Sequence, residues 1–124
     1  MKQLSRLLLA AALVAAAPTA WADGDAERGQ KKFEECQACH SLDRNAESVG
    51  PSLYGVFGRK AGTLADFRYS PAMKRSGIAW SSEGVDAFIV DPQKVVPANR
   101  MPYAGMADAS DRADLIAYLQ KTFK

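Results

Sequence analysis

Histidine and cysteine are scarce in this chain, which has one histidine and two cysteines among its 124 residues. A structural zinc site takes four ligands, usually from these two residue types, and three such residues cannot complete it. The scarcity therefore argues against zinc. It also means that any thiol or imidazole chemistry must involve Cys36, Cys39 and His40.

Long apolar runs are also missing, apart from one near the start. Residues 7–17 are apolar, but as a helix they would span only about 17 Å of a hydrocarbon core that is about 30 Å thick. Lys2 and Arg6 precede this run, and Ala20-Trp21-Ala22 follows it as an A-x-A cleavage site. The pattern predicts a cleaved secretory signal peptide over residues 1–22, export to a bacterial periplasm and no permanent membrane insertion.

Positive charge is neither abundant nor clustered. Without Lys2 and Arg6 the 16 basic residues become 14, which equals the 14 acidic residues, so the mature chain is neutral. No run of lysine or arginine indicates nucleic acid binding. Residues 59–100 carry seven basic and four acidic residues, and we expect this segment to orient a negatively charged protein partner. Its basic residues include Lys60, Lys74, Arg75, Lys94 and Arg100.

Internal repeats, a second domain and convincing strand pairs are absent as well, so residues 23–124 are interpreted as one small domain. Capping residues and apolar spacing predict short helices after Asp25, from Ser70-Pro71 to Gly77, from Ser82 to Asp91, and from about Ser110 onward. Residues 41–69 hold four glycines and are predicted to form an irregular loop. Pro92, Pro97 and Pro102 predict a stiff, non-helical loop. The expected fold class is all-α, with short helices joined by long loops.

The sequence Cys36-Gln37-Ala38-Cys39-His40 matches C-x-x-C-H, the signature of covalent c-type haem attachment. Each thiol can form a thioether with one haem vinyl group, and the adjacent imidazole can then bind the iron. A thioredoxin-like dithiol would require a βαβ context that this chain lacks. A plain disulfide leaves the adjacent histidine unexplained. The motif therefore predicts one haem c, attached through Cys36 and Cys39, with His40 as an iron ligand.

The ligand on the other face of the iron decides between two classes of function. A methionine opposite histidine is typical of electron transfer, whereas an open or labile sixth site is typical of a haem enzyme or a gas-binding protein. Met101 is the favoured candidate because it lies in the proline-stiffened loop downstream of His40; Met106 is the reserve, and Met73 is interpreted as packing. The chain has no second histidine and no obvious distal acid–base pair. We therefore expect an electron carrier and not an enzyme; a sensory or assembly module is a third possibility.

Nearly the whole mature chain resembles a class I c-type cytochrome of the mitochondrial and purple-bacterial branch. The resemblance lies in residues 24–29 with Phe33, and in residues 50–60, 67–70, 77–80 and 112–119. It implies the cytochrome c fold, with three to five short helices and long loops wrapped around one covalently bound haem. It also implies a soluble, monomeric one-electron shuttle. Its donor would be a quinol–cytochrome c reductase, and its acceptor an oxidase, a photosynthetic reaction centre or another reductase.

The resemblance further implies a role for individual residues. His40 would be the proximal and Met101 the distal iron ligand, and the Pro51 carbonyl would accept a hydrogen bond from the second ring nitrogen of His40. The residues expected at the haem propionates are Arg59, Tyr69 and Trp80.

Three positions depart from the family pattern near the iron. Phe88 stands where a tyrosine is common, and Met73 stands where an asparagine is common. Both changes remove polar groups, so we expect an altered redox potential. Asn99, two residues before Met101, is expected to replace a hydroxyl donor that is usual in that region.

Overall fold

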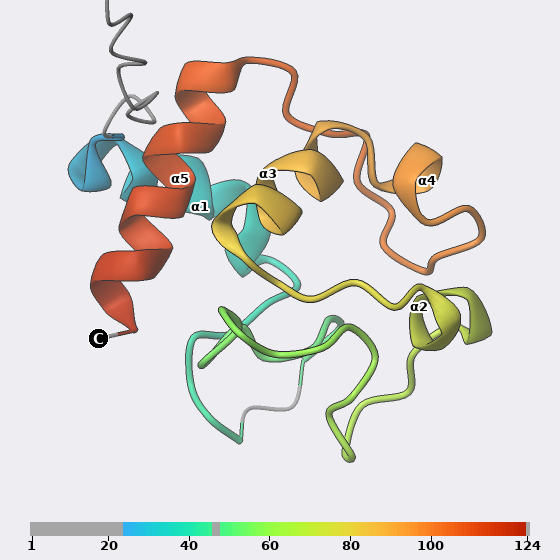
Figure 1. Ribbon diagram of the computed structural model, residues 1–124. Coiled ribbons are helices and arrows are strands. Elements are labelled where there is room, and N and C mark those ends of the chain that lie inside the picture. Colours follow the sequence, from blue (N-terminus) through green and yellow to red (C-terminus); the bar gives the residue numbers. More distant parts are fainter. Residues whose placement is uncertain (1–23, 46–47, 124) are drawn as a thin grey trace, which may run out of the picture.

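A computed structural model describes residues 24–45 and 48–123; the predicted signal peptide, residues 1–22, lies outside the described residues. Within those ranges the chain is helical and contains no strand beyond an isolated bridge between Lys60 and Ala79. The all-α prediction is therefore confirmed. The helices are α1 (Ala26–Gln37), α2 (Pro71–Arg75), α3 (Ser82–Val90), α4 (Pro92–Val95) and α5 (Ala109–Thr122) (Figure 1).

Polar side chains cap the helices where the sequence changes from loop to apolar periodicity. Asp25 accepts hydrogen bonds from two amides of α1, and Ser70 accepts one from Met73 at the start of α2. Ser81 and Asp108 cap α3 and α5 in the same way. These oxygens satisfy amides that have no partner within the helix, which is why the helices begin at these positions.

The prediction that residues 92–102 contain no helix is wrong at their beginning, where α4 lies. Pro92 occupies the first position of α4, where its missing N–H costs nothing because that amide would have no partner inside the helix. The Asp91 side chain accepts a hydrogen bond from the Lys94 amide and caps the same turn. A proline that ends α3 therefore also begins α4.

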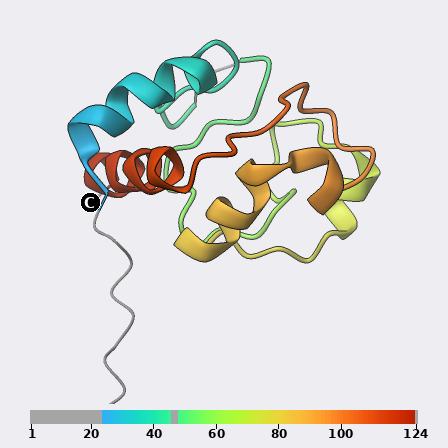
Figure 2. The ribbon, with the colours of Figure 1, turned by 90° about the horizontal axis from the view of Figure 1, so that it is seen from above.

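Helices α1 and α5 cross at one side of the molecule, as both ribbon views show, while α2 and α4 lie at the other side (Figures 1 and 2). The crossing is tight at Gly29, where a Cβ atom would lie 1.9 Å from the Asp114 carbonyl oxygen and 2.8 Å from Tyr118 Cβ. Phe33 meets Tyr118 one turn further along, with ring centroids 5.5 Å apart. The absent side chain at residue 29 lets the two backbones approach.

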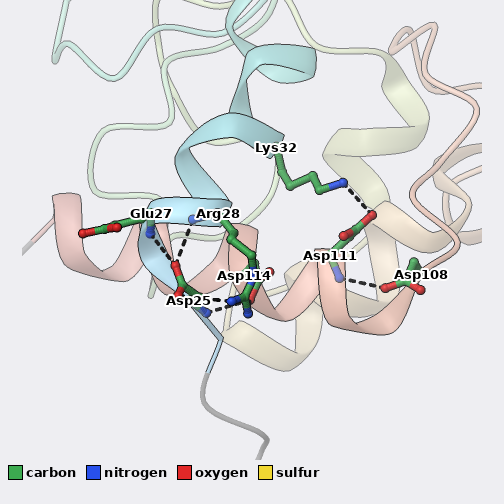
Figure 3. Close-up of polar contacts among 7 residues, drawn as sticks. All are labelled: Asp25, Glu27, Arg28, Lys32, Asp108, Asp111 and Asp114. Atoms are coloured by element: carbon green, nitrogen blue, oxygen red, sulfur yellow. Dashed lines mark hydrogen bonds and ion pairs between the residues drawn. The ribbon is translucent and has the colours of Figure 1, made fainter.

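Charged groups tie the same two helices together along their edge (Figure 3). Asp114 is 3 % exposed and accepts hydrogen bonds from the Asp25 amide at 2.6 Å and from Arg28 Nε at 2.7 Å. Lys32 pairs with Asp111 at 2.8 Å. The Arg28 guanidinium and the Asp25 amide hold the pKa of Asp114 below its usual value, because they stabilise the carboxylate.

The core lies between α1, α3 and α5 and continues into the loop that follows α4. Its buried members are Phe33, Val85, Phe88, Ile89, Val96, Met106, Leu115, Ile116 and Leu119. None of the helices in the described ranges has the length and apolar character needed to span a membrane.

Candidate functional site

A cavity of about 320 Å³ opens beside this core and receives side chains from both ends of the chain. All eight residues predicted as cofactor-binding line it: Cys36, Cys39, His40, Pro51, Arg59, Tyr69, Trp80 and Met101. Most of the remaining wall is apolar and includes Val85, Ile89 and Leu115. Such a wall suits a large, flat, apolar group.

The attachment motif forms a tight turn at the end of α1. The amides of Cys39 and His40 both donate to the Cys36 carbonyl, at 3.1 and 2.9 Å. Both thiols are free and half-buried, and both line the cavity. Burial raises the pKa of the Cys36 thiol to about 11, with smaller contributions from Glu35 and Cys39. The turn therefore presents two thiols and one imidazole to the same space.

The imidazole of His40 is fixed by the chain segment that follows it. His40 Nδ1 lies 2.7 Å from the Pro51 carbonyl oxygen, which can only accept, so Nδ1 carries the proton and Nε2 keeps its lone pair. A Cβ at Gly50 would lie 2.6 Å from His40 Cε1, so the ring requires a glycine there. Burial lowers the pKa of His40, although the Pro51 carbonyl opposes that shift, and a neutral ring is the form that binds a metal.

These features fit a haem c. Two thiols stand three positions apart, a neutral imidazole carries a free Nε2, and a largely apolar cavity lies beside them. Among the described residues, no group of three or more His, Cys, Asp and Glu side chains could hold a bare metal ion. The donor set is therefore that of a haem protein, with Cys36 and Cys39 as the attachment residues.

Met101 lies in the loop between α4 and α5, and Asn99 fixes that loop by hydrogen bonds. The Asn99 amide group donates to the carbonyls of Pro92 and Val96, at 2.8 and 3.0 Å, and its Oδ1 accepts from the Met101 amide at 2.7 Å. Both of its amide hydrogens are thereby used. Asn99 therefore fixes the Met101 backbone, and its expected replacement of a hydroxyl donor in this region stays a prediction.

The other two candidate methionines occupy different surroundings. Met106 is 6 % exposed, belongs to the core and does not line the cavity. Met73, on α2, is half-buried and does line it. Met101 shares the cavity with His40 and lies in a loop, where Asn99 Oδ1 accepts from its amide, whereas the Met73 amide donates to Ser70 at the start of α2.

Arg59 and Trp80 reach the cavity together because their backbones pair. The Trp80 amide donates to the Arg59 carbonyl at 2.9 Å, and the Gly58 amide donates to the Trp80 carbonyl at 2.7 Å. The Arg59 guanidinium donates to the carbonyls of Ser52 and Tyr54. Burial lowers the pKa of Arg59, which shows that its charge is partly removed from water.

Tyr69 and Phe88 complete the aromatic part of the wall. The Tyr69 ring stacks edge-on with Phe67 at 4.8 Å, and burial raises the pKa of its hydroxyl. Phe88 is buried and meets Trp80 at 5.1 Å. Phe88 therefore contributes an apolar ring to the wall of the cavity.

Sequence reasoning missed Tyr103, which also lines the cavity. Its hydroxyl donates to Glu35 Oε2 at 2.8 Å. Burial raises the pKa of Tyr103, and the hydrogen bond to Glu35 adds to the shift, so the hydroxyl keeps its proton and acts as the donor. An aromatic residue two positions after Met101 was the available signal, but the sequence does not reveal its partner.

The predicted basic residues are exposed at Lys60, Lys74, Arg75, Lys94 and Arg100. Arg100 also lines the cavity, and its guanidinium donates to the carbonyls of Arg68 and Tyr69 at 3.3 Å. It thereby connects the Met101 loop to the segment that carries Tyr69.

Comparison with known proteins shows the family to which the chain belongs. The sequence model of the family described as Cytochrome c matches residues 26–123. The chain is 46 % identical to a cytochrome c of Euglena viridis over 102 residues, which cover 82 % of this chain and 99 % of the relative. It is 40 % identical to a cytochrome c2 of Rhodomicrobium vannielii over 120 residues, covering 96 % and 95 %. A cytochrome c2 iso-2 of Magnetospirillum fulvum is 46 % identical over 88 residues, covering 71 % and 92 %.

Cytochromes c transfer electrons between redox partners and transform no substrate. Their single haem c is held covalently, and this chain has two cysteines for that purpose. The match extends over most of the described chain and includes the attachment motif, so the chain belongs to the cytochrome c family and is an electron carrier with one haem c.

Proposed function

We propose that this protein is a soluble periplasmic one-electron shuttle in which His40 and Met101 bind the haem iron from opposite faces. The observation that carries the proposal is that both side chains, together with Cys36 and Cys39, line one cavity. Bound there, haem c supplies a ferric/ferrous couple. A methionine opposite a histidine gives a six-coordinate iron that favours electron transfer.

The polypeptide holds His40 and Met101 in the same place whether the haem iron is oxidised or reduced. His40 is oriented by the Pro51 carbonyl and confined by the backbone at Gly50. The Met101 backbone is held by Asn99. Because these supports come from loops anchored on the core, little must rearrange when an electron arrives or leaves.

We assign Arg59, Tyr69 and Trp80 to the haem propionates. Arg59 offers a positive charge, and the other two side chains offer an O–H and an N–H donor. All three line the cavity, and pairing of residues 58–61 with residues 78–80 supports two of them. A half-buried positive charge and two donors suit a pair of carboxylates.

The N-terminal segment bears on the cellular location of the protein, and its basic surface residues bear on its redox partners. We propose that residues 1–22 are a signal peptide that is removed on export, and that residues 23–124 work as a monomer in the periplasm. The donor would be a quinol–cytochrome c reductase, and the acceptor an oxidase, a photosynthetic reaction centre or another reductase. The exposed basic residues Lys60, Lys74, Arg75, Lys94 and Arg100 would orient acidic partners, so docking rates should fall as ionic strength rises.

An absorption spectrum of the purified holoprotein, recorded with and without carbon monoxide, tests the proposal. A low-spin spectrum with the weak far-red methionine–iron band, unchanged by carbon monoxide after reduction, is expected. A high-spin spectrum that shifts with the gas would overturn the shuttle in favour of an enzyme or gas-binding protein. Met101→Ala should abolish the far-red band, whereas Met106→Leu and Met73→Leu should retain it.

A further inference from the structure

One hydrogen bond joins the two segments that enclose the cavity. The Tyr103 hydroxyl donates to Glu35 Oε2 at 2.8 Å, across 68 positions of sequence. Glu35 directly precedes Cys36 on α1, and Tyr103 lies two residues after Met101. Both side chains line the cavity. The bond therefore connects the helix of the attachment cysteines with the loop of the proposed distal ligand.

The backbone around Met101 shows why this connection matters. On the side before Met101, Asn99 fixes its amide, and on the other side the Tyr103 amide donates to the Met101 carbonyl at 2.9 Å. The next fixed point is Met106, whose amide donates to the Ile89 carbonyl at 2.7 Å. In the described structure, Tyr103 is the only residue of 102–105 with a side-chain hydrogen bond to another part of the chain.

We propose that Tyr103 is a positioning residue whose hydrogen bond to Glu35 holds the Met101 loop against α1 and closes that edge of the cavity. The proposal rests on Met101 being the distal ligand. The consequence is that the iron keeps Met101 in preference to external ligands. With the bond in place, Met101 stays in position and small nitrogen ligands reach the iron slowly. Without the bond, the loop opens more often between its supports at Asn99 and Met106.

The effect of the Tyr103 hydroxyl must be tested apart from the effect of its ring, because the ring also packs against the core. Tyr103→Phe keeps the ring and removes only the donor. Glu35→Ala removes the acceptor from the other side, and Glu35→Gln restores an oxygen that can accept. Glu34→Ala is the matched control, because Glu34 is also exposed on α1 and carries the same charge.

Two measurements on the holoprotein report loop opening. One is the rate at which imidazole replaces Met101 in the ferric state, followed by loss of the far-red band. The other is hydrogen exchange of the Tyr103 amide. We expect Tyr103→Phe and Glu35→Ala each to raise both rates by about fivefold to tenfold, as for loss of one hydrogen bond to a charged acceptor near the surface. The double variant should add less than about twofold to either single change, because both remove the same bond.

Glu35→Gln should recover most of the wild-type behaviour, and Glu34→Ala should match wild type. Tyr103→Phe rates within about twofold of wild type, or equal effects of Glu34→Ala and Glu35→Ala, would overturn the proposal. A wild-type spectrum without the far-red band would refute the proposed function instead. Amide exchange at Tyr103 would still test the tie between the loop and α1 in that case.

Discussion

Replacing Asn99 with alanine removes four hydrogen bonds from the loop that carries Met101. The former partners of Asn99 differ in whether they keep another hydrogen bond. The Pro92 carbonyl still accepts from the Val96 amide, and the Val96 carbonyl still accepts from the amide of residue 99. The Met101 amide loses the one acceptor that the structure gives it within the described residues.

The expected cost follows from that difference. A buried N–H without a partner costs about 1–3 kcal/mol, and each bond lost between groups that keep another partner costs about 0.5 kcal/mol. For Asn99, which is 8 % exposed, we expect a total of about 3 kcal/mol. All the partners lie within residues 92–101, so the cost destabilises this loop locally. At about 1.4 kcal/mol per factor of ten, the open loop becomes more populated by about a hundredfold.

The assay is imidazole titration of the ferric holoprotein, with the far-red methionine–iron band as the second readout. Asn99→Ala should bind imidazole about a hundredfold more tightly and show a weakened band. Gln93→Ala is a graded control: the Gln93 amide donates from the exposed side to Asn99 Oδ1 at 2.9 Å and to the carbonyls of Asn99 and Met101 at 3.1 and 3.4 Å. Because Gln93 is exposed, the loss of these bonds should change the affinity by less than about fivefold. An Asn99→Ala protein with an intact band and an affinity within about threefold of wild type would refute the reasoning.

Three further changes test the fold and the site. Gly29→Ala forces α1 and α5 apart, because the new Cβ meets the Asp114 backbone, and should lower the free energy of unfolding by about 2 kcal/mol in urea titrations. Asp114→Asn should destabilise the protein by about 1–2 kcal/mol near neutral pH. Since the pKa of Asp114 is depressed in the folded state, its stabilisation is present above the unfolded pKa near 4 and is lost as pH falls through the folded pKa, so the two proteins should converge in acid. Arg59→Gln removes a positive charge that disfavours the oxidised site, and should lower the midpoint potential measured by redox titration.

Each of these changes has an informative control. Gln30 lies on the exposed side of α1 beside Gly29. Gln30→Ala should leave the free energy of unfolding unchanged within about 0.5 kcal/mol. A constant difference between wild type and Asp114→Asn from neutral to acid pH would show that the charge of Asp114 is irrelevant. A midpoint that rises in Arg59→Gln would contradict the assigned role of Arg59.

Sequence reasoning succeeded where the chemistry is local. Cys36, Cys39 and His40 are adjacent in sequence, and helix caps such as Asp25 and Ser70 act within three residues. The resemblance to c-type cytochromes then placed Pro51, Arg59, Tyr69, Trp80 and Met101, all of which line one cavity. Patterns within a few residues and long family motifs were sufficient to select residues that line one cavity, while their roles at a haem stay predictions.

The failures concern interactions that depend on three-dimensional direction. Proline at residue 92 was interpreted as excluding a helix, although at the first position of α4 it does not. The role of Asn99 depends on which way the carbonyls of Pro92 and Val96 point. The contact between Tyr103 and Glu35 joins segments 68 residues apart, so neither residue alone indicates it. Periodicity and spacing carry no information of this kind.

The crossing of α1 and α5 also determines the order in which parts of the site can assemble. A chain synthesised from its N-terminus makes Cys36, Cys39 and His40 long before the residues of α5 exist. Leu115 and Leu119, which line the same cavity, are among the last residues made. Closing so long a loop is slow and entropically costly. We therefore expect the attachment turn to be more exposed before the C-terminal helix docks than in the folded chain, where both thiols are half-buried.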